Sequence, residues 1–358
     1  MPSVSPVSTR MRQEIEQIPE AVARLLGADP ATLESAAAAV HGARPRLVSI
    51  VARGTSDHVA VYAKYLFEVY LGVPVQLVAP AVTTVYGATL PRRGGVMIAI
   101  SQSGRVDDAI VMTQQARRMG WPTIAVTNDL ASPLAAAADH LLVCRAGRED
   151  AIPATKTYSL ALVVIAALLA RLAPQSDVAL NLPRLPDELS ASLRAASAWV
   201  DGADRGAGSP VEAFASEGRA LIVSRGYNLA TALEVALKLK EAAGMFAEAY
   251  SSADLLHGPV VLAGAGVPML VIRPDGRMGR YVDDAIVAAE QRGGRPFVIG
   301  GAEVADRAGS LHMAESLPEA LTPIVYALPG QLLAEAVGRR RGLNPDQPGG
   351  LHKVTRTR

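Results

Sequence analysis

Three ionisable residues in the second half of the chain have a spacing that could support proton transfer. Glu234, Lys238 and Glu241 follow one another at intervals of four and three residues, so a helix would place them on one face. A carboxylate can move a proton at a carbon beside a carbonyl group, while a second acid–base group serves the oxygen. The same spacing is also typical of a solvated salt-bridge stripe, worth ~0.2–0.5 kcal/mol per pair, and spacing alone favours that interpretation.

Two further residues could take part in such chemistry but indicate little alone. His257 precedes Gly258-Pro259, which is a loop signal, and a single loop histidine is usually a surface residue. Lys353 lies in the terminal sequence GGLHKVTRTR, where one more charge is ordinary. Neither residue defines a site without other evidence.

A second candidate site follows an apolar run in the first half. Met97–Ile100 suits a buried strand, Ser101–Gly104 (SQSG) suits a turn, and Asp107–Met119 has helical spacing. The free N–H groups at a helix start favour an anion, and the serine hydroxyls add donors. We therefore expect an anion site at this turn. The alternative is that Ser103 only caps the helix.

The composition limits the classes of function. The chain has 358 residues, enough for roughly two domains of ~100–200 residues each, and 50% of its residues are hydrophobic. Its net charge of +1 gives no case for nucleic-acid binding or for a basic membrane-binding patch. The single cysteine, Cys144, excludes an intrachain disulfide and a cysteine-rich metal site, and it fits a reducing compartment.

No segment indicates membrane insertion or export. The longest apolar run, Leu160–Ala170, is too short for a bilayer span, which takes ~20 residues. The N-terminal segment carries Glu14 and Glu16 and has no signal-like apolar region. We expect a soluble, cytoplasmic protein.

Alternating strands and helices in the first half predict an α/β fold. Such alternation is typical of a parallel sheet with helices on both faces. Strands are expected at Leu47–Val51, Val73–Val78, Val96–Ile100, Thr123–Thr127 and His140–Val143, and helices at Met11–Leu26, His58–Tyr70, Asp107–Met119 and Thr157–Leu172. Within Met11–Leu26, Pro19 lies near an expected helix start.

The pattern starts again after a connector that is expected to contain several prolines and a polar helix. Strands are expected at Ala220–Ser224, Val267–Ile272 and Pro296–Ile299, with a strong helix at Leu229–Ala243. The sequence VARG (51–54) aligns with VSRG (223–226), which indicates an internal duplication. Because Tyr227-Asn228 stands where the first copy has Thr55-Ser56, we infer that one copy binds an anion and the other supplies something else.

Several motifs together resemble one family, the isomerase half of glucosamine-6-phosphate synthase, which is built from two sugar isomerase (SIS) domains. The motifs occur in the family's order and cover nearly the whole chain from Met11 onwards. They are ARGTS (52–56), SQSG (101–104), ATK (154–156), ALEVALKLKE (232–241), AEAYSSADLLHGP (247–259) and DQP…LHK (346–353).

The resemblance implies two tandem SIS domains, each a mostly parallel sheet with helices on both faces, as in a flavodoxin-like three-layer sandwich. The first domain with its N-terminal helices would occupy residues 1–175, a connector 176–206, the second domain 207–345, and a tail that closes the site 346–358.

The resemblance also implies roles for individual residues. Glu241 is the base that moves a proton between C1 and C2, and Lys238 assists proton transfer at a substrate oxygen. His257 opens the sugar ring from a neighbouring subunit of a homodimer, and Lys353 closes over the substrate. The sugar phosphate and nearby hydroxyls are assigned to Gly54, Thr55, Ser56, Ser101, Gln102 and Ser103.

The sequence departs from the family where the sugar is held. Arg105 and Val106 stand where the family has an acid and a phosphate-binding threonine; Arg105 could compensate by charge-assisted hydrogen bonds if it points inward. Ala154 replaces a sugar-contacting serine, and Gly349-Gly350 replaces Arg-Asn in the tail. The family's glutaminase half is not expected in this protein, because residue 2 is Pro2 and the only cysteine is Cys144.

The leading expectation is an aminosugar 6-phosphate isomerase/deaminase that converts glucosamine 6-phosphate to fructose 6-phosphate and ammonia. It needs no metal or other cofactor, and no metal-ligand spacing is visible. An N-acetylglucosamine 6-phosphate dehydratase using the same base, and a sugar-amine phosphate deglycase, are enzymatic alternatives. A non-catalytic sugar-phosphate sensor is the alternative of another class.

Overall fold

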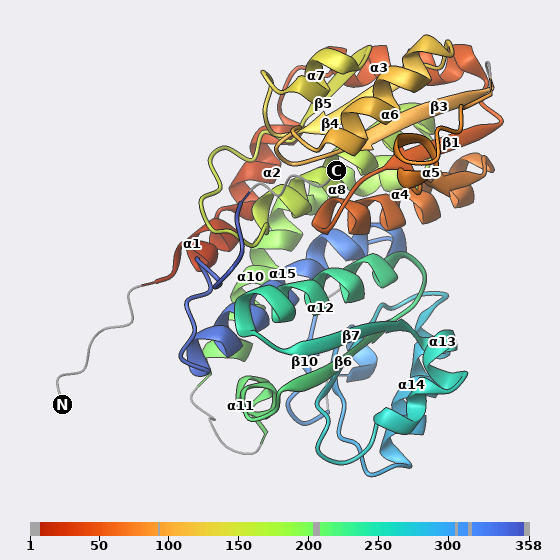
Figure 1. Cartoon of the computed structure of the whole chain (residues 1–358). Helices are drawn as coiled ribbons and strands as arrows, with labels where there is room; N and C mark the ends of the chain where they lie inside the picture. The colour runs from red at the N-terminus through yellow and green to blue at the C-terminus, as the bar shows by residue number, and fades with distance from the viewer. Residues whose placement is uncertain (1–7, 92–93, 203–207, 305–306, 314–316, 354–358) are drawn as a thin grey trace.

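The chain forms two α/β domains that follow one another in sequence and pack together (Figure 1). The structure is a computed structural model that describes residues 8–91, 94–202, 208–304, 307–313 and 317–353. The predicted fold class, two tandem domains with parallel sheets, is confirmed.

A five-stranded parallel sheet in the order β2-β1-β3-β4-β5 forms the first domain. Its central strands are short apolar runs buried along their length, as expected where helices cover both faces. The strands are β1 (Leu47–Val51), β2 (Val75–Leu77), β3 (Gly95–Ile100), β4 (Thr123–Thr127) and β5 (His140–Val143). Every strand predicted in this half is therefore present.

Helices cover both faces of this sheet. On one face, α8 (Lys156–Leu172) contacts both α3 (Ala31–Ala43) and α4 (Thr55–Leu71). On the other face, α6 (Asp107–Arg118) and α7 (Pro133–Ala137) enclose a smaller core with the sheet. The short α5 (Ala81–Thr84) lies against α6.

The second domain repeats this topology. Its sheet has the order β10-β9-β8-β6-β7, which corresponds strand by strand to β5-β4-β3-β1-β2. The strands are β6 (Arg219–Ser224), β7 (Phe246–Ser251), β8 (Met269–Arg273), β9 (Phe297–Gly300) and β10 (Leu311–His312). The shared order supports the duplication inferred from the two aligned turns.

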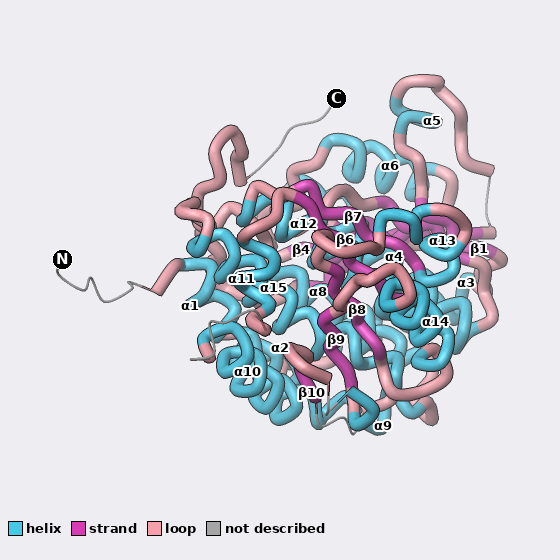
Figure 2. The backbone as a smooth tube through the Cα atoms, turned by 90° about the horizontal axis from the view of Figure 1, so that it is seen from below, coloured by secondary structure: helices cyan, strands magenta, loops and turns pink. Residues whose placement is uncertain are grey.

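Helices also lie on both sides of the second sheet. The strands run between α14 (Gly279–Glu290) on one side and α15 (Thr322–Arg340) on the other (Figure 2). Helix α12 (Leu229–Ala243) has the predicted bounds and packs on β6 and β7. The remaining helices of this half are α11 (Pro210–Ala215) and α13 (Ser252–Leu256).

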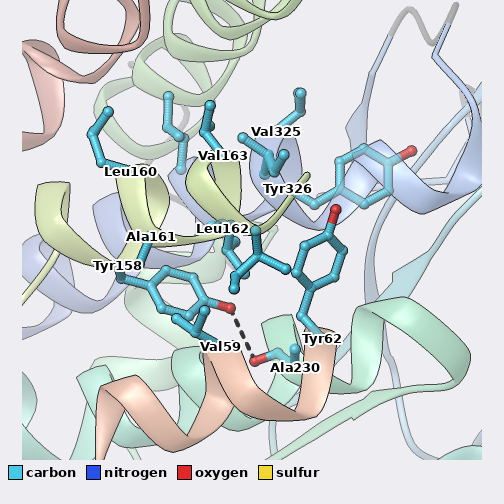
Figure 3. Close-up of a cluster of buried hydrophobic side chains, with 14 of the residues drawn as sticks. Val59, Tyr62, Tyr158, Leu160, Ala161, Leu162, Val163, Ala230, Val325 and Tyr326 are labelled. Atoms are coloured by element: carbon cyan, nitrogen blue, oxygen red, sulfur yellow. Dashed lines mark hydrogen bonds between the residues drawn. The ribbon is translucent and has the colours of Figure 1, made fainter. Parts of the chain in front are cut away.

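One hydrophobic core joins the two domains. Helices α4 and α8 of the first domain meet α12 and α15 of the second between the two sheets (Figure 1). Figure 3 shows this cluster, in which the Tyr158 hydroxyl donates to the Ala230 carbonyl at 3.3 Å. The buried Tyr62 hydroxyl donates to the Ala320 carbonyl at 2.9 Å. Side chains of the first domain thus satisfy carbonyls of the second.

One helical stretch in the described part of the chain, Glu319–Arg340, is long and apolar enough to cross a membrane by length and composition. The most apolar 18-residue window of this stretch is buried inside the protein, and helix α15 packs against α10 and α12. Its apolar character is therefore explained by the protein core.

Two segments differ from the sequence expectations. The predicted helix Met11–Leu26 is two helices, α1 (Arg10–Glu16) and α2 (Ile18–Leu26), because Pro19 begins a new helix instead of continuing the old one. The predicted connector 176–206 contains α9 (Asp177–Asn181) and α10 (Leu185–Asp201), and α10 packs against α2 and α15. The predicted domain limits stay predictions.

Candidate active site

Helix α12 carries a buried charged face. The side chains of Glu234 and Lys238 are fully buried, and that of Glu241 is 24% exposed. Lys238 Nζ lies 3.5 Å from Glu234 Oε1 and forms an ion pair with Glu241 Oε2. The interpretation as a solvated stripe is therefore wrong, since two of the three side chains have no contact with solvent.

The ammonium of Lys238 is held in its charged form. Burial would lower its pKa, but the carboxylates of Glu234 and Glu241 outweigh this effect and raise the pKa above its ordinary value. Lys238 is thus a cation beside Glu241. Its N–H groups can also donate to an oxygen that gains negative charge.

The first domain reaches this charged face through α4. The Thr55 hydroxyl accepts from Lys238 Nζ at 3.2 Å and donates to Glu234 Oε1 at 3.4 Å. His58 Nδ1, one turn further along α4, lies 2.8 Å from Glu234 Oε2. Sequence reasoning assigned neither His58 nor Glu234 to the site; the spacing of Glu234 before Lys238 was the only available signal.

The two turns expected to hold an anion lie side by side. Strands β1 and β3 are neighbours, so the turn after Val51 and the turn after Ile100 leave the same edge of the sheet. The connections from these strands diverge here, and such a switch point is where open α/β sheets bind ligands. Arg53 of one turn forms a 2.5 Å ion pair with Asp108 beyond the other.

The ARGTS turn presents its residues at the start of α4. Gly54 is exposed and has φ +57°, a conformation that glycine adopts without strain. Thr55 and Ser56 are half-buried in the first turn of the helix. Thr55 therefore belongs both to this turn and to the contacts with α12.

The SQSG turn is fixed by its own hydrogen bonds. The buried Ser101 hydroxyl accepts from the Gly104 N–H at 3.1 Å, and the Ser103 hydroxyl accepts from the Arg105 N–H at 3.3 Å. The Gln102 carbonyl accepts from Asn128 N at 3.1 Å. A Cβ on Gly104 would lie 2.2 Å from Ser132 Oγ, so only glycine allows this close approach.

Arg105 turns towards the neighbouring loop. Its guanidinium forms a 2.9 Å ion pair with Asp129, which follows β4. The charge of Arg105 is thus partly neutralised at the rim of the site. Val106 has an extended backbone and precedes α6 without a side-chain cap.

The tail lies against the loop that contains Ala154. Lys353 Nζ donates to Glu149 Oε2 at 2.9 Å and to the Ala151 carbonyl at 2.6 Å. The Ile152 N–H donates to the Asp346 carbonyl at 2.9 Å. Lys353 and Ala154 are therefore brought into one region, although they are 199 residues apart by their numbers 154 and 353.

Glu149 connects this region electrostatically to the charged face. Its side chain is fully buried, which would raise its pKa, but Lys353 and donors from Thr157 outweigh burial and lower the pKa. The Glu149 carboxylate also contributes to the raised pKa of Lys238. Sequence reasoning did not single out Glu149, because nothing in the spacing relates it to the tail.

His257 lies apart from these groups. It is exposed at the end of α13, and its backbone N–H donates to the Asp254 carbonyl at 3.2 Å. Among the described residues, no contact joins its ring to Glu241. The described residues also include no group of three or more His, Cys, Asp and Glu side chains that could hold a metal ion.

The chain is a double-domain α/β protein with one candidate composite site between its halves. This site combines Thr55 of the first domain with Lys238 and Glu241 of the second. The chain belongs to the SIS domain family, whose pattern matches residues 43–171 and 213–335. The family resemblance stated from the motifs is therefore confirmed.

Known proteins similar to this chain act on sugar phosphates. The isomerizing glutamine–fructose-6-phosphate aminotransferase of Zymomonas mobilis subsp. mobilis is 33% identical over 319 residues, which cover 86% of this chain and 51% of that protein. The chain thus spans about half the length of the curated relatives it matches.

Solved structures extend the comparison. A proposed phosphosugar isomerase from Silicibacter pomeroyi has a TM-score of 0.85 and 35% identity, and the match covers 94% of this chain and 100% of that chain. Glucosamine-6-phosphate deaminase from Thermotoga maritima has a TM-score of 0.76 and 22% identity, over 98% of this chain and 100% of that chain. At that identity, the second likeness shows the fold alone.

Proposed function

We propose that this protein is a phosphosugar isomerase of the SIS family, and more specifically an aminosugar 6-phosphate isomerase/deaminase. The observation that carries the proposal is the composite site itself. Glu241, a partly exposed carboxylate, lies beside the buried ammonium of Lys238. Lys238 is in turn hydrogen-bonded to Thr55 of the ARGTS turn. This arrangement can hold a phosphorylated sugar and move a proton along its carbon chain.

The proposed reaction converts glucosamine 6-phosphate and water to fructose 6-phosphate and ammonia. In the open-chain sugar, Glu241 takes the proton from C2 and returns it to C1. The amine on C2 loses a proton and the oxygen on C1 gains one, which gives an imine at C2 and a hydroxyl at C1. Water then hydrolyses the imine to the ketone with release of ammonia. Lys238 stabilises the oxygen at C1 while charge accumulates on it. A positioned base of this kind typically contributes ~10²–10⁴-fold to a rate.

The phosphate would lie at the two turns of the first sheet, held by Gly54, Thr55, Ser56, Ser101, Gln102 and Ser103. Lys353 would leave Glu149 and close over the substrate, beside Ala154. His257, exposed on α13, would reach the site of a second copy in a homodimer and open the sugar ring. We also propose that the protein acts in the cytoplasm, with no nucleic-acid or membrane partner.

The test is a product analysis with the purified full chain. Incubation with glucosamine 6-phosphate is expected to yield ammonia and fructose 6-phosphate in equal amounts. N-acetylglucosamine 6-phosphate is tested in parallel for an ultraviolet-absorbing enone, which would indicate the dehydratase, and a sugar–amino acid phosphate adduct for the deglycase. Binding of these sugars without turnover would instead support a sensor and overturn the enzymatic proposal.

A further inference from the structure

The second domain keeps the backbone arrangement of the SQSG turn of the first domain. Val51 pairs with Ala99 in the first sheet, and Val223 of the aligned turn pairs with Val271 in the second. Ala99 and Val271 are therefore corresponding residues. When the two segments are aligned from these residues without an insertion, Ser101–Val106 corresponds to Arg273–Met278. Helices α6 and α14 then begin at corresponding residues, Asp107 and Gly279. The two turns therefore have the same length and the same place at the sheet edge.

In the second domain, a carboxylate of the chain itself, that of Glu319, binds the backbone N–H groups of this turn. Glu319 Oε2 accepts from the Arg277 N–H at 2.8 Å and from the Met278 N–H at 3.4 Å. These two N–H groups correspond to those of Arg105 and Val106 in the first domain. Glu319 lies in the short 3-10 helix η5 (Glu319–Leu321), just before α15.

Glycine makes room for this carboxylate. A Cβ on Gly276, the counterpart of Gly104, would lie only 2.6 Å from Glu319 Oε2. A Cβ on Gly226, the counterpart of Gly54, would lie 2.8 Å from Met278 Cγ and in ordinary contact with Glu319 Oε1 at 3.8 Å, so Gly226 borders the carboxylate from the other turn. The Glu319 carboxylate is thus between the two turns that lie at the switch point of the second sheet.

The side chains that could hold a phosphate have been replaced. Arg273 and Asp275 stand at the positions of Ser101 and Ser103, and they form a 3.2 Å ion pair with each other. The nearly buried Arg273 also pairs with Asp283 at 2.6 Å. The second turn has therefore lost its hydroxyl donors but retained its backbone donors.

We propose that Glu319 is an internal ligand of the second domain. Its carboxylate takes the position that the phosphate of a sugar phosphate takes in the first domain, so each protomer binds one phosphorylated ligand and not two. That a phosphate binds in the first domain rests on the proposed function. The hydrogen bonds of Glu319 to the turn of the second domain do not depend on it. Removing the carboxylate should expose a latent site for a phosphate-sized anion.

The internal ligand also joins the domains. The carbonyl of Ala320, the residue after Glu319, accepts from the Tyr62 hydroxyl of α4. The short helix η5 is thus held by the second sheet through Glu319 and by the first domain through Tyr62. In the second domain, the turn that corresponds to the SQSG turn therefore helps to hold the two domains together instead of binding a substrate.

The test compares Glu319→Ala with Glu319→Gln and uses inorganic phosphate as the probe. Calorimetric titration of the folded proteins is expected to give one additional phosphate per protomer for Glu319→Ala relative to the unaltered protein. The glutamine amide oxygen can still accept from the two N–H groups, so Glu319→Gln should bind no additional phosphate. Glu34→Ala, at an exposed position on α3, is the matched control and should behave as the unaltered protein.

A folded Glu319→Ala variant without additional phosphate would overturn the proposal. If that variant does not fold, the number of ligands bound by the unaltered protein is the test. Binding of a second equivalent of glucosamine 6-phosphate or inorganic phosphate per protomer would contradict the proposal that Glu319 fills the second turn. A maximum of one equivalent would support it. Absence of any sugar phosphate binding would contradict the proposed function alone, because the gain of phosphate in Glu319→Ala concerns only the second domain.

Discussion

Thr55 and Lys238 are 183 residues apart in the chain and are joined by a hydrogen bond of 3.2 Å. Thr55 belongs to the ARGTS turn of the first domain, and Lys238 to the charged face of α12 in the second. Because Lys238 also pairs with Glu241, the proposed base is two contacts from the proposed phosphate turn. This relationship makes the site testable by single substitutions.

Replacing the proposed base should remove turnover without removing binding. Glu241→Gln keeps the size of the side chain but cannot accept a proton, so kcat with glucosamine 6-phosphate should fall by at least ~10²–10⁴-fold. The affinity for the sugar phosphate, measured by calorimetry, should change little. Glu248→Gln, on β7 and 40% exposed, is the control and should retain full activity. Retained activity in Glu241→Gln would exclude Glu241 as the base.

Replacing the buried cation should destabilise the protein. Lys238→Met leaves the fully buried Glu234 carboxylate without its ammonium, a type of change that costs about 3–5 kcal/mol. Lys240→Met on the same helix removes an exposed pair with Glu248, worth about 0–1 kcal/mol. Denaturant unfolding of both variants measures the difference. Equal losses of stability would show that burial of the charged face has no energetic consequence.

The close approach at Gly104 should make that turn intolerant of a side chain. Gly104→Ala combines a positive φ of +60° with a Cβ only 2.2 Å from Ser132 Oγ. Gly87→Ala has a similar φ of +72° but open space around the Cβ, so it should cost only the conformational strain, about 1–2 kcal/mol. Gly104→Ala should lose more stability and also bind phosphate more weakly. The prediction fails if thermal unfolding and phosphate titration do not separate the two variants.

The Glu149–Lys353 pair should give a defined pH dependence of stability. Because the pKa of Glu149 is lowered on folding, its ionised form stabilises the protein above the ordinary value of 4.5, and this contribution is lost as the pH falls through the lower folded pKa. Glu149→Gln resembles the protonated residue. Its stability deficit relative to the unaltered protein should therefore be full at neutral pH and shrink below about pH 4.5. A deficit that is independent of pH would contradict the ion pair.

Much of the fold could be predicted because its strands are short apolar runs and its longer helices have clear periodicity. Helix α12 has the bounds predicted from its sequence, Leu229–Ala243. The helix start predicted near Pro19 is confirmed by α2, whereas the preceding helix α1 was not separated from it because the apolar spacing continues across the proline. The packing of α10 was missed because an amphipathic helix between two domains also suits an exposed connector.

The site was less accessible to sequence reasoning, since its contacts cross between the two halves. Spacing placed Glu234, Lys238 and Glu241 on one face, but only packing against α4 shows that the face is buried. His58 and Glu149 meet their partners through the tertiary fold, so no local pattern identifies them. The orientation of Arg105 towards Asp129 likewise depends on the neighbouring loop.

The division of the site between two copies of one fold has a consequence for how such a protein can evolve. The first copy retains the turns that carry hydroxyl groups, and the second contributes the helix of the proposed base while its own turn is filled by Glu319. On the proposed function, the first copy binds the phosphate and the second supplies the base. On that function, a change that separated the two copies would divide the site, so selection for its activity would act on both copies together.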